Sequence, residues 1–135
     1  MYYFGLAGVD LLDLDSPSVA ATTTATNGVN GVDKYGIESH QITDGIISFS
    51  TDDSTAFSST GTLSNASGIA AAIAYLIAND IGDAGSTVAF TDGADTYVYQ
   101  QTGSGTGAHV LVELVGKVAD SIVSAGGSTG DLLIG

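Results

Sequence analysis

One stretch of this chain has the apolar spacing of a helix, in a sequence that is otherwise patterned like strands. Between Ile69 and Ile77, apolar residues recur at intervals of three and four, which places them on one face of an α-helix. They are Ile69, Ala72, Ile73, Leu76 and Ile77. We therefore predict an amphipathic helix over residues 66–80, capped among the polar residues of 64–67, with Asn79 at its polar end.

The segments on either side of this helix indicate short strands joined by tight turns. Asn27-Gly28 and Asp44-Gly45 are favoured hairpin turns, because both residue types tolerate positive φ. After the helix we predict strands over 86–91, 95–101, 109–115 and 131–134, while 115–124 is open to a short helical turn. Nineteen glycines suit so many turns. The predicted fold class is α+β, mostly β, with antiparallel strands and hairpins packed with one helix in a single domain over residues 1–135.

The charge of the chain limits its partners. Two basic residues stand against fifteen acidic ones, for a formal net charge of −13. Binding to nucleic acid or to an anionic membrane surface depends on lysine and arginine, so we expect neither partner. The acidic excess has two interpretations, which are simple solubility and the binding of divalent cations.

Residue types and segments that the sequence lacks exclude several kinds of chemistry and membrane insertion. The chain has no cysteine, which excludes disulfides, thiolate metal sites and cysteine catalysis. No apolar stretch approaches the ~18 residues that span a bilayer, so we expect no membrane insertion. The first residues, MYYFG, do not resemble a secretory signal peptide.

The side chains that could support catalysis stand outside recognisable motifs. His40 and His109 lie in predicted strands, away from any G-x-S-x-G elbow, and their spacing matches no zinc site. Glu38 and Glu113 are the only glutamates, and each alternates with apolar neighbours as the solvated face of a strand does. We therefore expect ordinary surface or strand-edge histidines, no catalytic residues and no enzymatic activity.

Aspartates in loops are the remaining candidates for a site. Asp80 and Asp83 lie in "NDIGDAG", and Asp92 and Asp95 lie in "TDGADT". Calcium takes about six to eight oxygen ligands, often from carboxylates on flexible loops. No EF-hand loop pattern occurs in the chain. We interpret Asp92 and Asp95 as a hairpin turn first, and all four aspartates as candidate ligands for a calcium cofactor second.

Several segments together resemble one protein family. The segment "VDLLDLDS" (9–16) is similar to the strand that follows the last calcium-binding nonapeptide repeats of RTX proteins. The segments "STVAFTDGADTYVYQQ" (86–101) and "HVLVELVGKVADSI" (109–122) resemble the C-terminal cap of RTX S-layer-like and haemolysin-type proteins. "GIESHQITDGIISF" (36–49) and "AAAIAYLIAND" (70–80) also look like that cap. The nonapeptide repeats are missing, so the calcium stack of the family is not carried over.

The resemblance implies a non-catalytic C-terminal cap and export module of a surface-layer or adhesin protein. Such proteins leave Gram-negative cells unfolded, through the type I secretion machinery, and act outside the cell or at its surface. They are typically acidic and poor in cysteine and lysine, as this chain is. The chain would then be the C-terminal part of a longer secreted protein. Two alternatives remain, which are the tail of a secreted enzyme with catalysis upstream and a structural subunit that self-associates at the cell surface.

Overall fold

The computed structural model describes residues 10–14, 17–21, 23, 26–27, 37, 39–50, 66–79, 81, 83–103, 109–124 and 131–135. Its elements in chain order are β1 (Asp10–Asp13), β2 (Ser18–Val19), β3 (Thr26–Asn27), β4 (Ser39–Thr43), β5 (Ile46–Ser50), α1 (Ala66–Ala78), β6 (Ser86–Thr91), β7 (Thr96–Gln101), β8 (His109–Leu114), β9 (Ile122–Ser124) and β10 (Asp131–Ile134). The predicted fold class, α+β with strands dominating, is confirmed.

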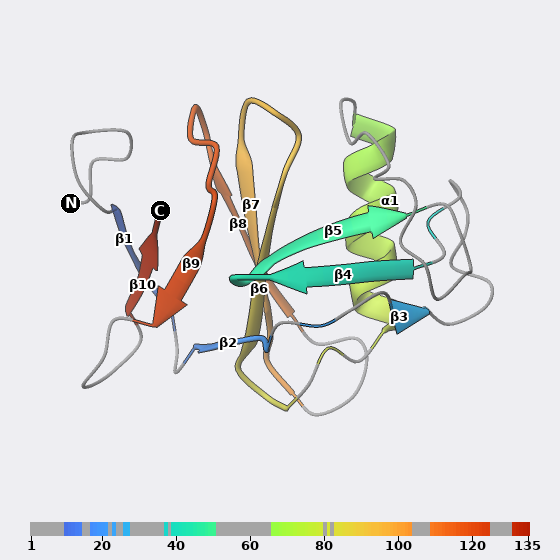
Figure 1. Ribbon diagram of the computed structural model, residues 1–135, viewed down its shortest axis with the longest axis horizontal. Helices are drawn as coiled ribbons and strands as arrows, with labels where there is room; N and C mark the ends of the chain where they lie inside the picture. Colours follow the sequence, from blue (N-terminus) through green and yellow to red (C-terminus); the bar gives the residue numbers. More distant parts are fainter. Residues whose placement is uncertain are drawn as a thin grey trace.

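The larger of two sheets has seven strands and forms the centre of the molecule (Figure 1). Its order is β3-β4-β5-β6-β7-β8, and β2 pairs with β6 off this path. On one side β6 pairs with β7 along its whole length. On its other side β6 is shared by two parallel partners, with Val19 of β2 opposite Thr87 and Ile46 of β5 opposite Ala89.

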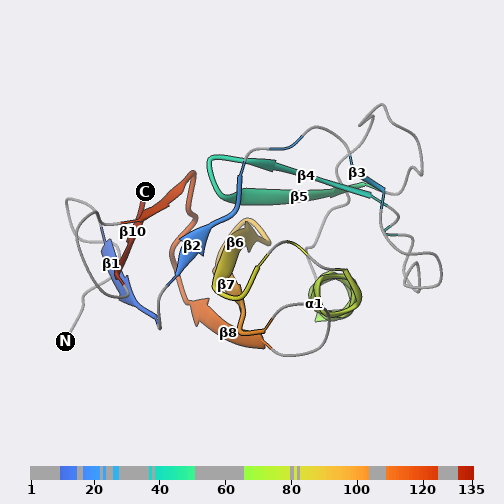
Figure 2. The same ribbon diagram turned by 90° about the horizontal axis from the view of Figure 1, so that it is seen from below.

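The smaller sheet joins the two ends of the described chain. Its order is β1-β10-β9, and all its pairings are antiparallel. Asp10 of β1 pairs with Ile134 of β10, so residues from the start and the end of the sequence lie side by side. Figure 2 shows this sheet and the helix on opposite sides of β6 and β7.

Two of the predicted hairpin turns are confirmed, at Asp44-Gly45 and at Asp92–Asp95. Strands β4 and β5 meet at Asp44-Gly45, where both residues have positive φ, 51° and 77°. Strands β6 and β7 meet around Asp92–Asp95, with Thr91 paired to Thr96. The first turn follows from residue type, since Asn, Asp and Gly adopt positive φ most readily.

The helix covers one face of the central sheet and closes the first core. Of the predicted apolar stripe, Ala72 and Leu76 are buried, whereas the three isoleucines are partly buried and pack against the core. Tyr75, outside the predicted stripe, is 0% exposed, as is Leu76. Phe49 packs edge-on against Tyr75 and against Phe90, with ring centroids 5.7 Å and 5.6 Å apart. Such edge-to-face contacts add to the stabilisation from buried area. The helix ends at Ala78 rather than at residue 80.

The opposite face of the central sheet packs on the smaller sheet and forms the second core. Ala89 and Val98 of the central sheet cluster with Leu132 and Ile134 of β10. Along β6, Val88 and Phe90 belong to the first core and Ala89 to the second. Because successive side chains of a strand point to opposite faces, neighbouring residues of β6 contribute to different cores.

Three expectations need correction, and one turn is not described. Residues 115–124 form no helical turn; they contain a turn after β8 and then strand β9. Asn79 is 6% exposed, so the end of the helix is not a polar, solvated one. The predicted strand at 95–101 begins one residue later, at Thr96. The predicted turn at Gly28 lies outside the described residues.

The helix is too short to cross a bilayer, and the described part of the chain holds no other that could.

Candidate functional site

The tip of the β6–β7 hairpin holds two of the predicted calcium ligands in a tightly hydrogen-bonded turn. The Oδ1 atom of Asp92 accepts hydrogen bonds from the backbone N–H groups of Ala94 at 2.9 Å and Asp95 at 2.8 Å. These two bonds hold the pKa of Asp92 below its usual range, and the bond from Asp95 lowers it most. The carboxylate therefore caps the turn in its charged form.

The second aspartate links this tip to a neighbouring turn. The Oδ1 atom of Asp95 accepts a hydrogen bond of 2.6 Å from the backbone N–H of Gly116, in the turn that follows β8. The backbone carbonyl of Asp95 also accepts a 2.8 Å bond from the hydroxyl of Thr91. Both aspartates thus have a structural function as turn formers, as the sequence predicts first.

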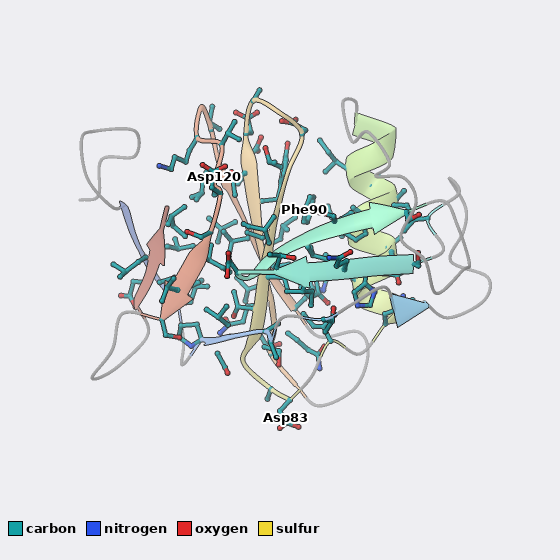
Figure 3. All side chains as sticks on the ribbon, in the orientation of Figure 1. Asp83, Phe90 and Asp120 are labelled. Carbon is teal, nitrogen blue, oxygen red and sulfur yellow. The ribbon has the colours of Figure 1, made fainter. Side chains whose placement is uncertain are left out.

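The other two predicted ligands do not join them. Asp83 precedes β6 and lies at the end of that strand opposite to the hairpin tip (Figure 3). A strand of six residues is roughly 20 Å long, so Asp83 and Asp92 cannot bind one ion. Asp80 lies outside the described residues. Within the residues that are described, no three His, Asp or Glu side chains gather as metal ligands would.

His40 is the residue that sequence reasoning placed least well. The expectation of a surface or strand-edge histidine is wrong, because β4 lies between β3 and β5 and the side chain is 7% exposed. Its Nδ1 atom lies 2.7 Å from the hydroxyl of Tyr75, and the two rings meet edge to face. A signal was present, since His40 stands two residues before Ile42 and so shares its buried face.

Burial sets the protonation of this pair. Loss of hydration lowers the pKa of His40 and raises the pKa of Tyr75 well above its ordinary value. Both groups therefore stay neutral near pH 7, with the hydrogen bond between them satisfying their polar atoms inside the first core. This arrangement is that of a buried structural pair.

His109 lies far from His40, on the outer strand of the sheet. Three strands, β5 to β7, lie between β4 and β8 in the order of the sheet, so the two histidines are not on neighbouring strands. The ring of His109 stacks on Tyr99 with centroids 5.4 Å apart. Glu113, on the same strand, accepts a 3.3 Å hydrogen bond from the hydroxyl of Tyr97. Glu38 lies outside the described residues.

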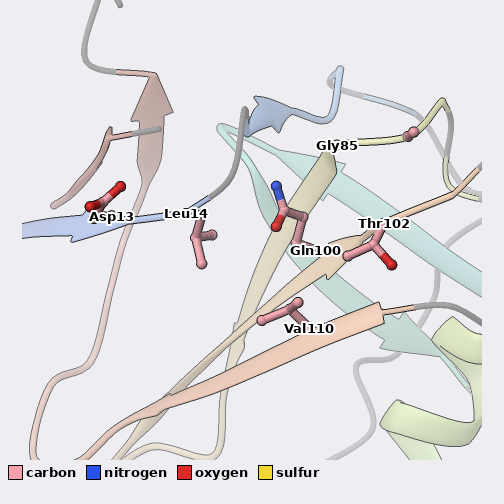
Figure 4. A pocket seen from close by; sticks show the side chains of 7 residues that line it. Asp13, Leu14, Gly85, Gln100, Thr102 and Val110 are labelled. Atoms are coloured by element: carbon pink, nitrogen blue, oxygen red, sulfur yellow. The ribbon is translucent and has the colours of Figure 1, made fainter. Parts of the chain in front are cut away.

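A shallow pocket of about 430 Å³ lies where the end of β1 meets the central sheet (Figure 4). Asp13 and Leu14 line it at the end of β1. Gln100 of β7, Thr102 just after β7 and Val110 of β8 also line it. Its exposed polar groups are the carboxylate of Asp13 and the hydroxyl of Thr102. No sequence motif announces it, because its residues come from three distant segments.

Comparison with known proteins finds no family model, no curated protein and no solved structure that matches this chain. The resemblance to RTX proteins stays an expectation from the segments quoted above. In the structure those segments contribute β1, the β4–β5 hairpin, most of α1 and the strands β6 to β8.

Proposed function

We propose that this chain is a non-catalytic cap and export module of a surface-layer or adhesin protein secreted by a type I system. The observation that carries the proposal is the position of β1, which is formed by the DLLD portion of the segment "VDLLDLDS". In the RTX family the strand similar to it directly follows the repeats. A cap must offer an edge to such repeats and must close its own core.

Strand β1 supports both requirements, because it lies at an edge and is packed against a core. It is the outer strand of the smaller sheet, and among the described residues only β10 pairs with it. Its other edge therefore presents backbone N–H and C=O groups to which a preceding strand could add. Leu12 and Leu14 pack against the second core and hold the strand in place.

Export is tested with a passenger protein fused ahead of Met1. We expect the passenger in the medium of a Gram-negative host that carries a type I exporter, and inside the same host without it. A matched fusion that lacks residues 131–135 has lost the whole of β10, and we expect that fusion to stay in the cell because the signal of this family is C-terminal. Equal amounts in the medium with and without the exporter would contradict the export role.

The capping role is tested separately, with a block of RTX repeats fused ahead of the chain. We expect the repeats to fold, as followed by circular dichroism, at lower calcium concentration than the block alone. A fusion to an unrelated folded domain of similar size is the control. If that domain lowers the calcium requirement equally, the chain has no specific capping role.

A further inference from the structure

The outer edge of β8 differs from the other edges of this fold. Strand β8 is the last in the central sheet, and in the described part of the chain only β7 pairs with it. The opposite edge strand, β3, has two residues, whereas β8 has six. Natural edges are usually protected by shortness, lysine, proline or a bulge. The sequence HVLVEL contains neither lysine nor proline.

Exposed apolar side chains gather along and just beyond this strand. Among the described residues five large hydrophobic side chains are exposed, and four of them lie between 110 and 118. They are Val110 at 40%, Leu111 at 37%, Val115 at 75% and Val118 at 45%. An apolar, unprotected edge of this length is a template for pairing with another strand.

We propose that a second copy of this chain pairs with β8 in antiparallel fashion, about a two-fold axis at Leu111. In that register Leu111 faces Leu111 of the second copy, and Val110 faces Val112 of the second copy. The two central sheets would become one continuous sheet. This inference goes beyond the proposed cap and export role, because it concerns the folded chain by itself.

The charges on β8 select this register. His109 and Glu113 lie on one face of the strand, two residues on either side of Leu111. A two-fold axis at Leu111 therefore places each Glu113 opposite the other copy's His109, where the carboxylate can accept a hydrogen bond from the imidazole. Moving the axis to Glu113 would bring two carboxylates together, which destabilises a cross-strand pair. An axis at Val112 would place Glu113 opposite Leu111.

Both side chains are already positioned by their own sheet. The ring of His109 is stacked on Tyr99, and Glu113 is hydrogen-bonded by the hydroxyl of Tyr97. Ordering flexible side chains at an interface weakens association, so groups that are held beforehand favour it.

The net charge of the molecule opposes this pairing and gives it a salt dependence. Two copies of a chain with a charge of −13 repel each other. The Debye length falls from about 30 Å at ~0.01 M salt to about 8 Å at ~0.15 M. We expect the dimer to be tighter at the higher ionic strength, since the edge contacts are short-range and the repulsion is long-range.

The test is sedimentation velocity on the purified chain over a range of concentrations at both salt levels. We expect a monomer–dimer equilibrium for the natural sequence. Leu111→Lys places two ammonium groups on the axis and should leave only monomer. Val123→Lys is the matched control, because Val123 is an aliphatic residue 53% exposed on β9, and this variant should dimerise like the natural chain.

A charge exchange tests the register itself. Glu113→Lys places a lysine opposite His109, and His109→Glu places a glutamate opposite Glu113. Each variant should weaken the dimer about tenfold or more. The double variant exchanges the two positions and should recover affinity to within about threefold of the natural chain. Circular dichroism and thermal melting show whether each variant is folded.

The proposal is overturned if the natural chain stays monomeric at both salt levels, if Val123→Lys disrupts the dimer as strongly as Leu111→Lys, or if the folded double variant fails to recover. None of these results bears on export, which is measured in cells on the fused passenger.

Discussion

At the scale of single residues, Gly45 lies in a turn that side chains of two strands, β2 and β9, approach closely. Its φ is 77°, and an added Cβ would lie 2.8 Å from the Cγ1 of Val19 and in closer conflict with the Cγ1 of Ile122. Gly116 has a φ of 76° and nothing within 4 Å of the same added atom. Gly45 and Gly116 therefore share the backbone requirement and differ in packing.

We expect Gly116→Ala to lower the free energy of unfolding by roughly 1–2 kcal/mol, the strain of a left-handed backbone. Gly45→Ala should lose that amount and about 1–3 kcal/mol more, because the methyl group overpacks the junction. Urea denaturation of the two variants measures the difference. Equal losses would show that the junction can open to admit a methyl group.

The buried pair His40 and Tyr75 predicts a dependence of stability on pH. Burial lowers the pKa of His40 in the folded state, while the unfolded chain binds a proton near the ordinary ~6.5. The stability from neutral His40 is therefore complete above that pH and is lost as pH falls below it. The loss cannot exceed about 1.4 kcal/mol per pH unit for one group.

We expect His40→Asn, which keeps a polar atom near the Nδ1 position, to lose this part of the pH dependence. Unfolding free energies of both chains at about pH 7.5 and 5.5 give the measurement, with the natural chain losing more on acidification. If the two chains differ in unfolding free energy by the same amount at both pH values, His40 is not the source of the pH dependence.

At the scale of elements, the helix depends on its buried stripe and on one amide at its end. Leu76→Ala should destabilise the fold by about 2–5 kcal/mol, because the side chain is 0% exposed. Asn79→Ala should cost about 1–3 kcal/mol, since Nδ2 donates a 2.7 Å bond to the carbonyl of Tyr75 in a buried setting. Ala74→Ser, on the exposed face, is the control and should change stability by at most about 0.5 kcal/mol. Thermal and urea unfolding rank the three variants, and a Leu76→Ala chain as stable as Ala74→Ser would contradict the packing described.

The elements that could be predicted from the sequence are those whose signals are local. Helical spacing located α1 to within two residues at its end, and Asp44-Gly45 located the first hairpin. Strand β9 was missed because its three residues form only by pairing with β10 and have no period of their own. The burial of His40 was missed although it shares a strand face with Ile42, because only tertiary packing brings its partner Tyr75 to it. At the candidate site, the turn was predicted from residue type, whereas the pocket beside Asp13 depends on contacts between distant segments.

At the scale of the whole molecule, the charge of −13 should make stability depend on salt. Screening by monovalent salt should raise the melting temperature, because it weakens repulsion within the folded state. For calcium we expect no more stabilisation than from magnesium at matched concentration. The Oδ1 atoms of Asp92 and Asp95 already accept backbone hydrogen bonds, and in the described part of the chain no three His, Asp or Glu side chains gather around them.

Calorimetry with millimolar calcium or magnesium checks this expectation. A specific site would add about 2.7 kcal/mol at a hundredfold excess over Kd. If calcium alone stabilises, and if the change of both Asp92→Asn and Asp95→Asn removes the effect while Asp83→Asn at the other end of β6 does not, the hairpin tip is a calcium site. Asparagine retains an acceptor oxygen, so the turn itself should survive these changes.

The pairing of β1 with β10 has a consequence for the order of folding. Asp10 meets Ile134 across almost the whole sequence, and a contact of such separation must overcome a large loss of chain entropy before it stabilises anything. The second core lacks Leu132 and Ile134 until the last strand has been synthesised. Strand β1 therefore cannot pair until β10 has been made, and we expect the second core to close after the local hairpins have formed. If the chain is exported as we propose, that delay leaves time for an unfolded polypeptide to reach the channel before the fold can close.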